Sequence, residues 1–392
     1  MRFILIFLFL ITQSVAQSTM ISGFISDSSS GEALIGANVI LQETGQGMAT
    51  DINGYYIIQD IVPGNYVLMV SYVGFSLRKE KLSISDRQSI KLNIALSEEV
   101  VELSQVEVTA EQIQRRANIQ PSKINLSPRM MKAAPALAEP DLFRTIQALP
   151  GVLTTSEFST GLVIRGGNTD QNLILLDGVT VYNPSHLGGI FSNFIVDGVK
   201  EAELIKGAYN AEYGGRLSAV LNIISREGNQ KKFEGKANLS LLSAQATLEG
   251  PFYKGAWVLS GRRTYFDQIF KSNPNIPPYY FYDIQSHVYS DLTPKDRLSI
   301  SFYNGIDDLL FGTFGLAGRW GNNTLSTQYR RVFSEKLIGN FLYANSLFFT
   351  EFGLGGSNGL NSDNQIDDAT VAANFSWFKS SESTIKFGVQ LK

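Results

Sequence analysis

Two histidines, His186 and His287, supply the imidazoles of this chain, and cysteine is absent. The absence of cysteine excludes disulfides, thiolate metal sites and cysteine nucleophiles. The histidines lack a paired metal-ligand spacing, and no arrangement of nucleophile, base and orienting residue is visible. We therefore expect no enzymatic activity, no metal site and no cofactor. His186, two residues after Pro184, could contact a metal chelate; an ordinary surface position is the alternative.

Glycine marks four segments that follow one another in the middle of the chain: Leu149–Val152, Ile164–Gly167, Leu176–Val179 and Ala211–Arg216. Glycine permits positive φ angles or a close approach of backbones, so its first role here is structural. The residues to which we assign structural roles are Arg165, Gly166, Gly167, Asp177, Gly178, Tyr213, Gly214, Gly215 and Arg216.

Short elements must position these segments within residues 136–228. Asp141 can cap a short helix whose Leu142, Ile146 and Leu149 share one face, and Pro150 with Gly151 ends it. Strands are expected at Val163–Ile164, Asn172–Leu176, Val199–Ile205 and Val220–Ser225. The polar loops between them offer candidate ligand-binding residues, namely Ser156, Asn168, Gln171, Tyr182 and His186, although an ordinary loop is the alternative for each.

Residues 229–392 read as strands of about ten residues with alternating apolar positions, such as Leu298, Ile300 and Phe302, which is typical of a membrane β-barrel. We expect about eight strands in this region. Aromatic residues make up 11% of the chain, as an interfacial girdle requires. Short connections near Pro294–Asp296 and Ser334–Lys336 alternate with long ones near Phe266–Pro278, Gly305–Gly321 and Phe352–Gln365.

The N-terminal part contains a leader, a small domain and a connector. Arg2 followed by the apolar run Phe3–Ile11 predicts a signal peptide over residues 1–16, because a spanning helix, the alternative, needs roughly 20 apolar residues. Short strands separated by turn residues predict an all-β sandwich over 17–96. A polar connector with several prolines follows over 97–135.

The charge balance excludes one class of partner. With 33 basic and 36 acidic residues, the sequence gives no electrostatic reason to expect nucleic acid.

The four glycine-marked segments, followed by the alternating strands, resemble the plug and the start of the barrel of a TonB-dependent outer-membrane receptor. The N-terminal segments Gly36–Val39, Thr50–Tyr55, Pro63–Tyr66 and Tyr72–Phe75 resemble a carboxypeptidase-regulatory-like domain. The resemblance implies a mainly β protein with an N-terminal β-sandwich, a small α+β plug and an antiparallel transmembrane barrel. Val220 replaces the family's usual glycine, a departure that we expect to affect local packing alone.

The resemblance also gives roles to particular residues. Arg165 matches a buried plug arginine that pairs with barrel carboxylates, so we expect it to lock the plug to the wall. The segment comprising Gln105, Val106, Glu107, Val108, Thr109 and Ala110 matches the TonB box, a strand that binds the periplasmic energy transducer. The alternative for this segment is the last strand of the preceding domain.

The function that the resemblance implies is import into a Gram-negative cell across its outer membrane, in contact with outer-membrane lipid. A TonB-type transducer would draw on the inner-membrane proton gradient and bring in an extracellular ligand such as a ferric siderophore or another metal chelate. An oligosaccharide importer of the same architecture and a ligand-sensing signalling receptor are the alternatives.

The length of the barrel region is short for this family. A plugged transporter barrel has 22 strands, which need roughly 220 residues before loops. Residues 229–392 provide 164. We therefore expect the chain to be a fragment of a longer protein.

Overall fold

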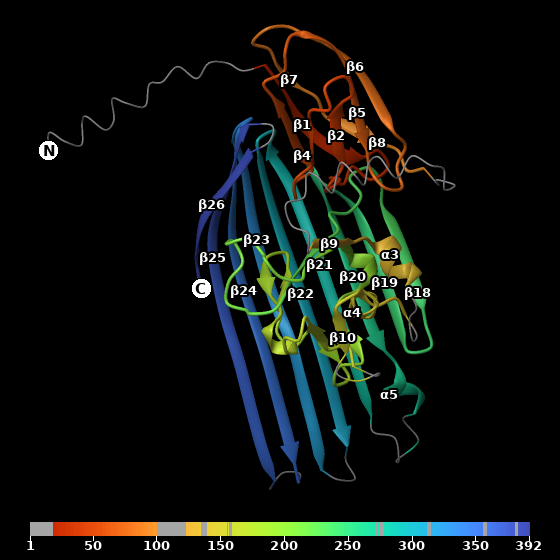
Figure 1. Cartoon of the computed structure of the whole chain (residues 1–392). Coiled ribbons are helices and arrows are strands. Elements are labelled where there is room, and N and C mark those ends of the chain that lie inside the picture. Colours follow the sequence, from red (N-terminus) through yellow and green to blue (C-terminus); the bar gives the residue numbers. More distant parts are fainter. Residues whose placement is uncertain are drawn as a thin grey trace, which may run out of the picture. The chain divides into compact units, whose positions relative to one another are not determined.

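A computed structural model describes residues 19–99, 123–134, 139–154, 156, 159–270, 273, 278–311, 315–355, 359–380 and 383–392. The predicted signal peptide and the TonB-box-like segment lie outside these residues. The chain divides into two compact units, one holding the N-terminal β domain and the other the plug with nearly all of the β-wall (Figure 1).

The N-terminal unit is all-β, as the turn spacing predicts, and it contains two four-stranded sheets. One has the order β4-β1-β7 with β8 also paired to β1, and the other has the order β3-β2-β5-β6. A core of aliphatic side chains with the buried Tyr56 fills the unit. The strands are β1 (Met20–Asp27), β2 (Asn38–Leu41), β3 (Gly47–Ala49), β4 (Tyr55–Gln59), β5 (Gly64–Ser71), β6 (Arg78–Ile84), β7 (Ser89–Lys91) and β8 (Ile94–Leu96).

The plug is built on a five-stranded mixed sheet with the order β13-β12-β17-β16-β9. Its edge strand β9 (Lys123–Leu126) and helix α3 (Pro128–Ala133) precede the expected start at residue 136, so part of the predicted connector belongs to the plug. The other elements are α4 (Leu142–Gln147), β10 (Val152–Thr154), β11 (Leu162–Ile164), η1 (Thr169–Gln171), β12 (Leu173–Leu176), β13 (Val179–Thr180), β14 (Ser185–His186), β15 (Phe191–Ser192), η2 (Val196–Gly198), β16 (Val199–Ile205) and β17 (Val220–Ser225).

Local sequence signals explain the plug elements. The Asp141 carboxylate accepts hydrogen bonds from the backbone N–H groups of Phe143 (2.8 Å) and Arg144 (3.0 Å), so it caps α4 as predicted. Strands β16 and β17 have the predicted bounds. One face of the sheet and the apolar face of α4 bury a common core, in which all but one of the buried members come from the plug itself.

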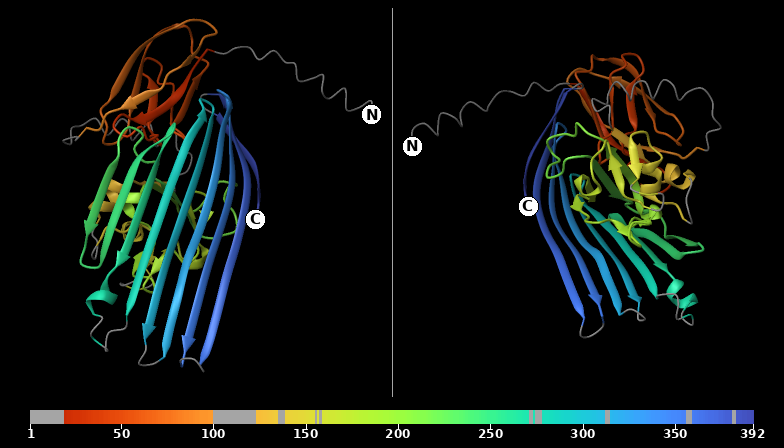
Figure 2. Two further views of the ribbon diagram at one scale, coloured as in Figure 1. Left: turned by 180° about the vertical axis from the view of Figure 1, so that it is seen from behind. Right: turned by 60° about the horizontal axis from the view of Figure 1, so that its bottom comes forward.

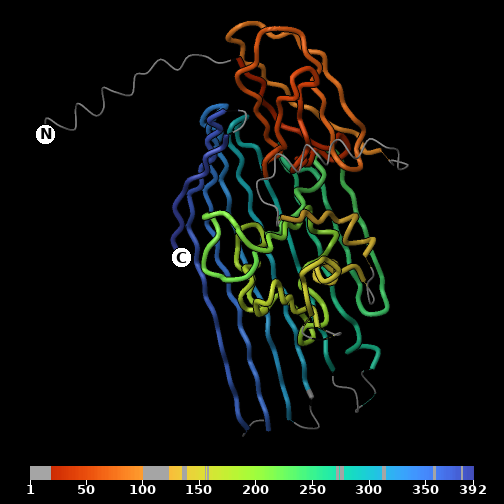
Figure 3. Tube along the Cα trace, viewed as in Figure 1, coloured from red at the N-terminus to blue at the C-terminus, as the bar shows by residue number. Residues whose placement is uncertain are grey.

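The wall is one continuous antiparallel sheet with the order β18 to β26. Its curved surface holds the plug on the concave side (Figure 2), and the tube view follows the plug chain across that side (Figure 3). The strands are β18 (Glu234–Leu239), β19 (Ser243–Phe252), β20 (Gly255–Thr264), β21 (Tyr279–Thr293), β22 (Asp296–Phe311), β23 (Leu316–Ser334), β24 (Leu337–Leu354), β25 (Leu360–Ser380) and β26 (Ser383–Leu391); helix α5 (Phe266–Ile269) follows β20.

The wall differs from the sequence expectation in two respects. It has nine strands in the described residues, where about eight were expected. The segments around Gly305–Gly321 and Phe352–Gln365 are not long loops, because β22 pairs with β23 up to Phe311 and Leu316, and β24 pairs with β25 up to Leu354 and Leu360. In both hairpins the main-chain pairing continues well beyond the roughly ten residues that a strand needs to cross a membrane. Most of the residues that were expected to form loops are therefore paired strand residues.

Across the residues that the structure describes, helices are too short or too polar to span a membrane.

Candidate functional site

The plug meets the wall through a fully buried network of charged side chains, centred on His186 in β14. The imidazole lies between two wall carboxylates: Nε2 is 2.8 Å from Asp283 Oδ1 and Nδ1 is 2.6 Å from Asp307 Oδ2. Its ring stacks on the Phe281 ring at 4.1 Å between centroids. Because both ring nitrogens contact carboxylate oxygens, both donate hydrogen bonds and the ring is an imidazolium.

The electrostatics of the network agree with this protonation state. Burial lowers the pKa of His186, but the charges and hydrogen bonds of Asp283 and Asp307 outweigh burial and raise the pKa to about 9. The histidine is therefore cationic at neutral pH, and it compensates carboxylates that would otherwise be buried without a partner.

Arg262 of β20 carries the network to a second part of the plug. Its Nε and Nη2 donate to Asp283 Oδ2 at 2.8 and 2.6 Å, and its Nη1 donates to Glu139 Oε1 at 2.6 Å. Nη2 also donates to the backbone carbonyl of Ser192 at 2.7 Å. The guanidinium therefore joins a wall carboxylate, a plug carboxylate and a plug carbonyl, as its fixed fork of donors allows.

Hydroxyl groups complete the site. Tyr303 donates to Asp283 Oδ1 at 2.7 Å, and Tyr279 donates to Asp307 Oδ1. The backbone N–H of Leu187, next to the histidine, also donates to Asp307 Oδ1 at 3.0 Å. These neutral donors stabilise the carboxylates, which outnumber the two cations of the network.

Two further contacts fix the plug to the wall. The Asp177 carbonyl accepts hydrogen bonds from Ser326 Oγ (2.9 Å) and Gln328 Nε2 (2.7 Å) of β23. Arg226, which directly follows the last plug strand β17, forms a two-point ion pair with Glu249 of β19: Nη1 is 2.9 Å from Oε1 and Nη2 is 2.7 Å from Oε2. The arrangement holds the plug through polar groups on several strands, together with one small apolar cluster in which Phe191 of the plug packs against Tyr279 and Phe281 of the wall. An interface that is largely polar can be separated and wetted.

The expected lock residue is not part of this network. Arg165 is exposed on the plug and has a positive φ of 50°, so it is not buried against the nine strands of the described wall, and its pairing with barrel carboxylates stays a prediction. The buried arginine between plug and wall is Arg262, which belongs to the wall. The sequence marks Arg262 merely as a polar residue at an inward position of an alternating strand.

The predicted glycine roles vary between positions. Gly166, Gly178 and Gly215 have φ values of 81°, 82° and 79°, as a structural role requires. A Cβ at Gly167 would lie 2.4 Å from Ser218 Oγ, so that glycine allows a close approach.

Tyr213 packs beside a small apolar cluster that includes Leu173. The carboxylate of Asp177 accepts from Ser225 N and Oγ, which joins two strands of the plug.

The candidate ligand-binding residues do not form one cluster. Asn168 and Gln171 cap the short helix η1, and Ser156 is exposed on a separate turn. The Tyr182 hydroxyl donates to Asp368 of the wall at 2.9 Å. His186 is completely buried, so both the surface position and direct ligand contact are excluded for this conformation. Ligand contacts by the other four residues stay a prediction.

The site and the fold define a class of protein: a curved β-wall that carries a polar-anchored plug on its concave side. A family model described as TonB-dependent Receptor Plug Domain matches residues 128–220, and one described as CarboxypepD_reg-like domain matches residues 21–108. The chain thus joins a segment that matches a carboxypeptidase-regulatory-like domain to one that matches the plug of TonB-dependent receptors, followed by the nine-stranded antiparallel wall. The CarboxypepD_reg-like model overlaps residues 105–108 of the TonB-box-like segment, so the comparison leaves open whether that segment is a TonB box or the last strand of the preceding domain.

Curated relatives and solved structures agree with this assignment. The chain is 28% identical over 244 residues to TonB-dependent receptor P26 of Formosa agariphila, covering 58% of this chain and 23% of that protein. It is 24% identical over 247 residues to the TonB-dependent transporter Oar of Myxococcus xanthus, covering 60% and 22%. Its fold is similar to that of a mutant ferric enterobactin receptor of Pseudomonas aeruginosa, with 19% identity, a TM-score of 0.51, and coverage of 70% and 49%. The chain therefore spans less than a quarter of the matched curated relatives.

Proposed function

We propose that the protein containing this chain imports a large, scarce ligand across the outer membrane of a Gram-negative bacterium. The observation that carries the proposal is the plug, anchored to the wall by buried ion pairs around His186 and Arg262. A plug that is held to the wall largely by ion pairs and hydrogen bonds suits a transporter in which the plug must leave the wall and return. The curated relative named a transporter supports the same class of activity.

The energy for displacing the plug comes, in this proposal, from a TonB-type transducer that pulls on residues 105–110. The first described element after that segment is β9, which lies at the edge of the plug sheet and pairs with β16 alone. Lys123 at its start forms an ion pair with Glu203. A force applied to the preceding chain would therefore reach an edge strand held by four backbone pairings first.

The ligand that we favour is a ferric siderophore or another metal chelate. Strand alternation gives Trp320, Phe348 and Phe352 the same orientation as wall residues that touch the plug, such as Ser326, and places them toward the ends of the long hairpins. Aromatic rings offer flat apolar surfaces for a chelate with ring groups. Stacking on sugar rings would favour the oligosaccharide alternative, so the ligand test must include both classes.

Deleting residues 106–110 from the full-length protein tests the energy coupling. We expect ligand binding at the cell surface to be retained and uptake to be lost, because the plug is intact but cannot be pulled. Deletion of the equally long segment 112–116 is the matched control and should leave uptake unchanged. Normal uptake by the 106–110 deletion would contradict the assignment of the box.

The ligand class is tested by supplying ferric chelates as the sole iron source and oligosaccharides as the sole carbon source to cells with and without the gene. A growth defect restricted to the chelates is the expected result. A defect restricted to the oligosaccharides would replace the chelate with the sugar alternative.

A further inference from the structure

Strand register distinguishes the outward face of the wall from the face that contacts the plug. Ser326, Gln328 and Leu342 approach the plug, so the residues that alternate with them on β23 and β24 point outward. The paired residues Tyr343 and Val371, which belong to the outward set, are 49% and 53% exposed. This face is the one that contacts lipid if the wall spans a membrane.

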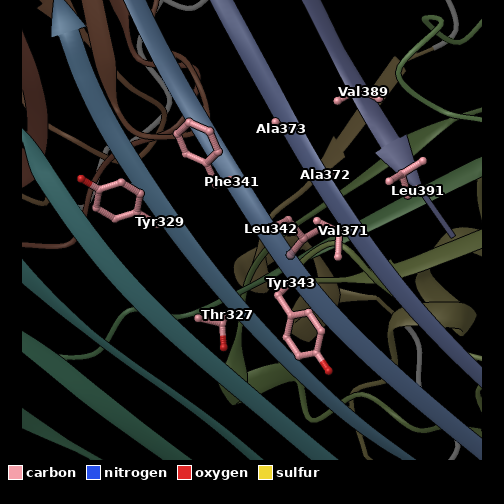
Figure 4. A pocket seen from close by; sticks show the side chains of 10 residues that line it. All are labelled: Thr327, Tyr329, Phe341, Leu342, Tyr343, Val371, Ala372, Ala373, Val389 and Leu391. Carbon is pink, nitrogen blue, oxygen red and sulfur yellow. The ribbon is translucent and has the colours of Figure 1, made fainter.

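A groove of about 330 Å³ runs along the outward face over β25, between β24 and β26 (Figure 4). Phe341 and Tyr343 form one side, Val389 and Leu391 form the other, and Val371 and Ala373 lie between them. The groove exists because a small residue, Ala373, is paired with the large Phe341 across the two strands. Its surface is almost wholly apolar, so water is a poor occupant and a hydrocarbon chain is a good one.

An aromatic cluster closes the groove toward the short-turn end of the sheet. Phe375 stacks on Phe387 at 5.3 Å and meets Phe341 edge-on at 5.7 Å. Gly339 gives the cluster its space, because a Cβ there would lie 2.8 Å from a ring atom of Phe333 and 3.1 Å from one of Phe375. Aromatic rings gather where a barrel surface passes from hydrocarbon to headgroups.

A cation lies beside this cluster at the height expected for headgroups. The half-exposed Arg331 guanidinium is placed over the Phe333 ring at 5.6 Å. Its Nη1 is 3.4 Å from Asp296 Oδ1 and 3.4 Å from the Tyr329 hydroxyl, and the guanidinium has further N–H donors beyond those of Nη1 on a side chain that is half exposed. A phosphate at this height would complement the guanidinium charge.

We propose that this groove is a binding site for one membrane phospholipid, with an acyl chain over Ala373 and its phosphate near Arg331. The site rests on the proposed membrane location of the wall. The short-turn end of a barrel faces the periplasm, so the lipid belongs to the inner leaflet of the outer membrane. The aromatic cluster sets the depth of the glycerol, and the groove orders the chain beneath it.

The test is native mass spectrometry of the full-length protein, released from detergent after addition of palmitoyl-oleoyl-phosphatidylglycerol. Wild-type protein should retain one phospholipid under conditions that remove the others. Ala373→Phe fills the groove, and the loss of contact with even two methylene groups should lower occupancy about tenfold. Arg331→Gln removes a single exposed cation and should lower occupancy about threefold. Ala369→Phe, at another outward position of the same strand, is the matched control and should bind as the wild type does.

Equal retention by wild type and Ala373→Phe, or none by wild type, would overturn the site. Barrel assembly is checked by the heat-dependent electrophoretic mobility of each variant, and Ala373→Leu replaces Ala373→Phe if the phenylalanine variant fails to assemble. Cell fractionation separates this result from the proposed function: a protein absent from the outer membrane refutes the function, whereas a membrane protein without retained lipid refutes the lipid site alone.

Discussion

At the residue scale, His186 has an unusual environment, with a carboxylate on each ring nitrogen and no contact with solvent. The neighbouring groups that face it are Asp283 and Tyr279 on β21, Asp307 and Tyr303 on β22, and Arg262 on β20. Glu139 lies on the far side of Arg262. Because carboxylates outnumber cations in this network, loss of the histidine proton leaves negative charges facing one another inside the protein.

Plug docking should therefore depend on pH through His186. The pKa rises from 6.5 to about 9 in the folded protein, so the ionic contribution is complete below pH 6.5 and is lost as the pH rises through 9. The shift corresponds to about 3 kcal/mol. Hydrogen exchange of the plug amides, measured at pH 6 and at pH 9.5 after correction for intrinsic exchange, should show weaker protection at the higher pH.

His186→Gln should abolish this pH dependence and leave weak protection at both pH values. His287→Gln is the comparison: His287 also lies at the plug–wall interface, 2.8 Å from Ser301 Oγ and 4.0 Å from Asp177 Oδ2, but it is outside the His186 network, so this variant should keep the pH dependence. Unchanged pH dependence in His186→Gln would show that another group titrates.

The adjacent residues Arg262 and Arg263 provide a second comparison. Arg262 is buried in the network, whereas Arg263 has 43% of its side chain exposed and pairs with Asp267 at 2.8 Å. Arg262→Met removes the cation that pairs with the buried carboxylates of Glu139 and Asp283, so it should cost about 3–5 kcal/mol. Arg263→Met removes an exposed ion pair and should cost at most about 1 kcal/mol.

Urea unfolding of both arginine variants measures the difference, and the rate of protease cleavage within the plug shows whether the plug is the part affected. Similar destabilisation by both substitutions would argue that the network contributes no more than a surface pair.

At the element scale, the turn between β12 and β13 aligns the plug with the wall. Gly178 in this turn has a φ of 82°, and a Cβ there would lie 3.1 Å from Leu342 Cδ2 of the wall. The preceding Asp177 carbonyl accepts two hydrogen bonds from β23. A change in the turn should therefore disturb the plug and its contact with the wall together.

Gly178→Ala should weaken plug docking by more than the backbone cost of about 1 kcal/mol that alanine pays at positive φ. Gly166→Ala is the matched control, because Gly166 has a φ of 81° but open space around the added Cβ. Protease sensitivity of the plug in the two variants gives the comparison. Equal sensitivity would show that contact with Leu342 adds nothing to the backbone strain.

At the scale of the whole molecule, the plug and the wall are stabilised in different ways. The plug core is almost entirely its own, with Tyr303 as the wall's contribution among the buried members. The interface with the wall combines ion pairs and hydrogen bonds with one small apolar cluster around Phe191 and Phe281. A plug of this kind can leave the wall without losing its apolar core.

Residues 123–228 expressed alone should accordingly fold, with a cooperative thermal transition seen by circular dichroism. The isolated plug should be less stable than the plug in the receptor, because Glu139 and His186 lose their partners. Leu204→Asp, which places a charge in the plug core, is the unfolded reference. A chain without a cooperative transition would show that the wall is needed to fold the plug.

The predictable part of the structure was local. Strands β16 and β17 and the Asp141 cap follow from alternation, apolar runs and capping chemistry within a few residues. The extent of β22 to β25 was not predicted, because glycine and polar residues in the hairpin ends also occur in loops, and pairing with a neighbouring strand decided between the two.

The sequence by itself determined that this is a mainly β chain with a sandwich, a glycine-turned plug and an alternating wall, since each of those signals is carried by neighbouring residues. The tertiary structure alone decided that His186 is buried and that Arg262, rather than Arg165, joins the plug to the described wall. The partners of His186 are 97 and 121 residues away along the chain. Burial and charge pairing at such separations arise from how the plug packs in the wall, and no local pattern encodes them.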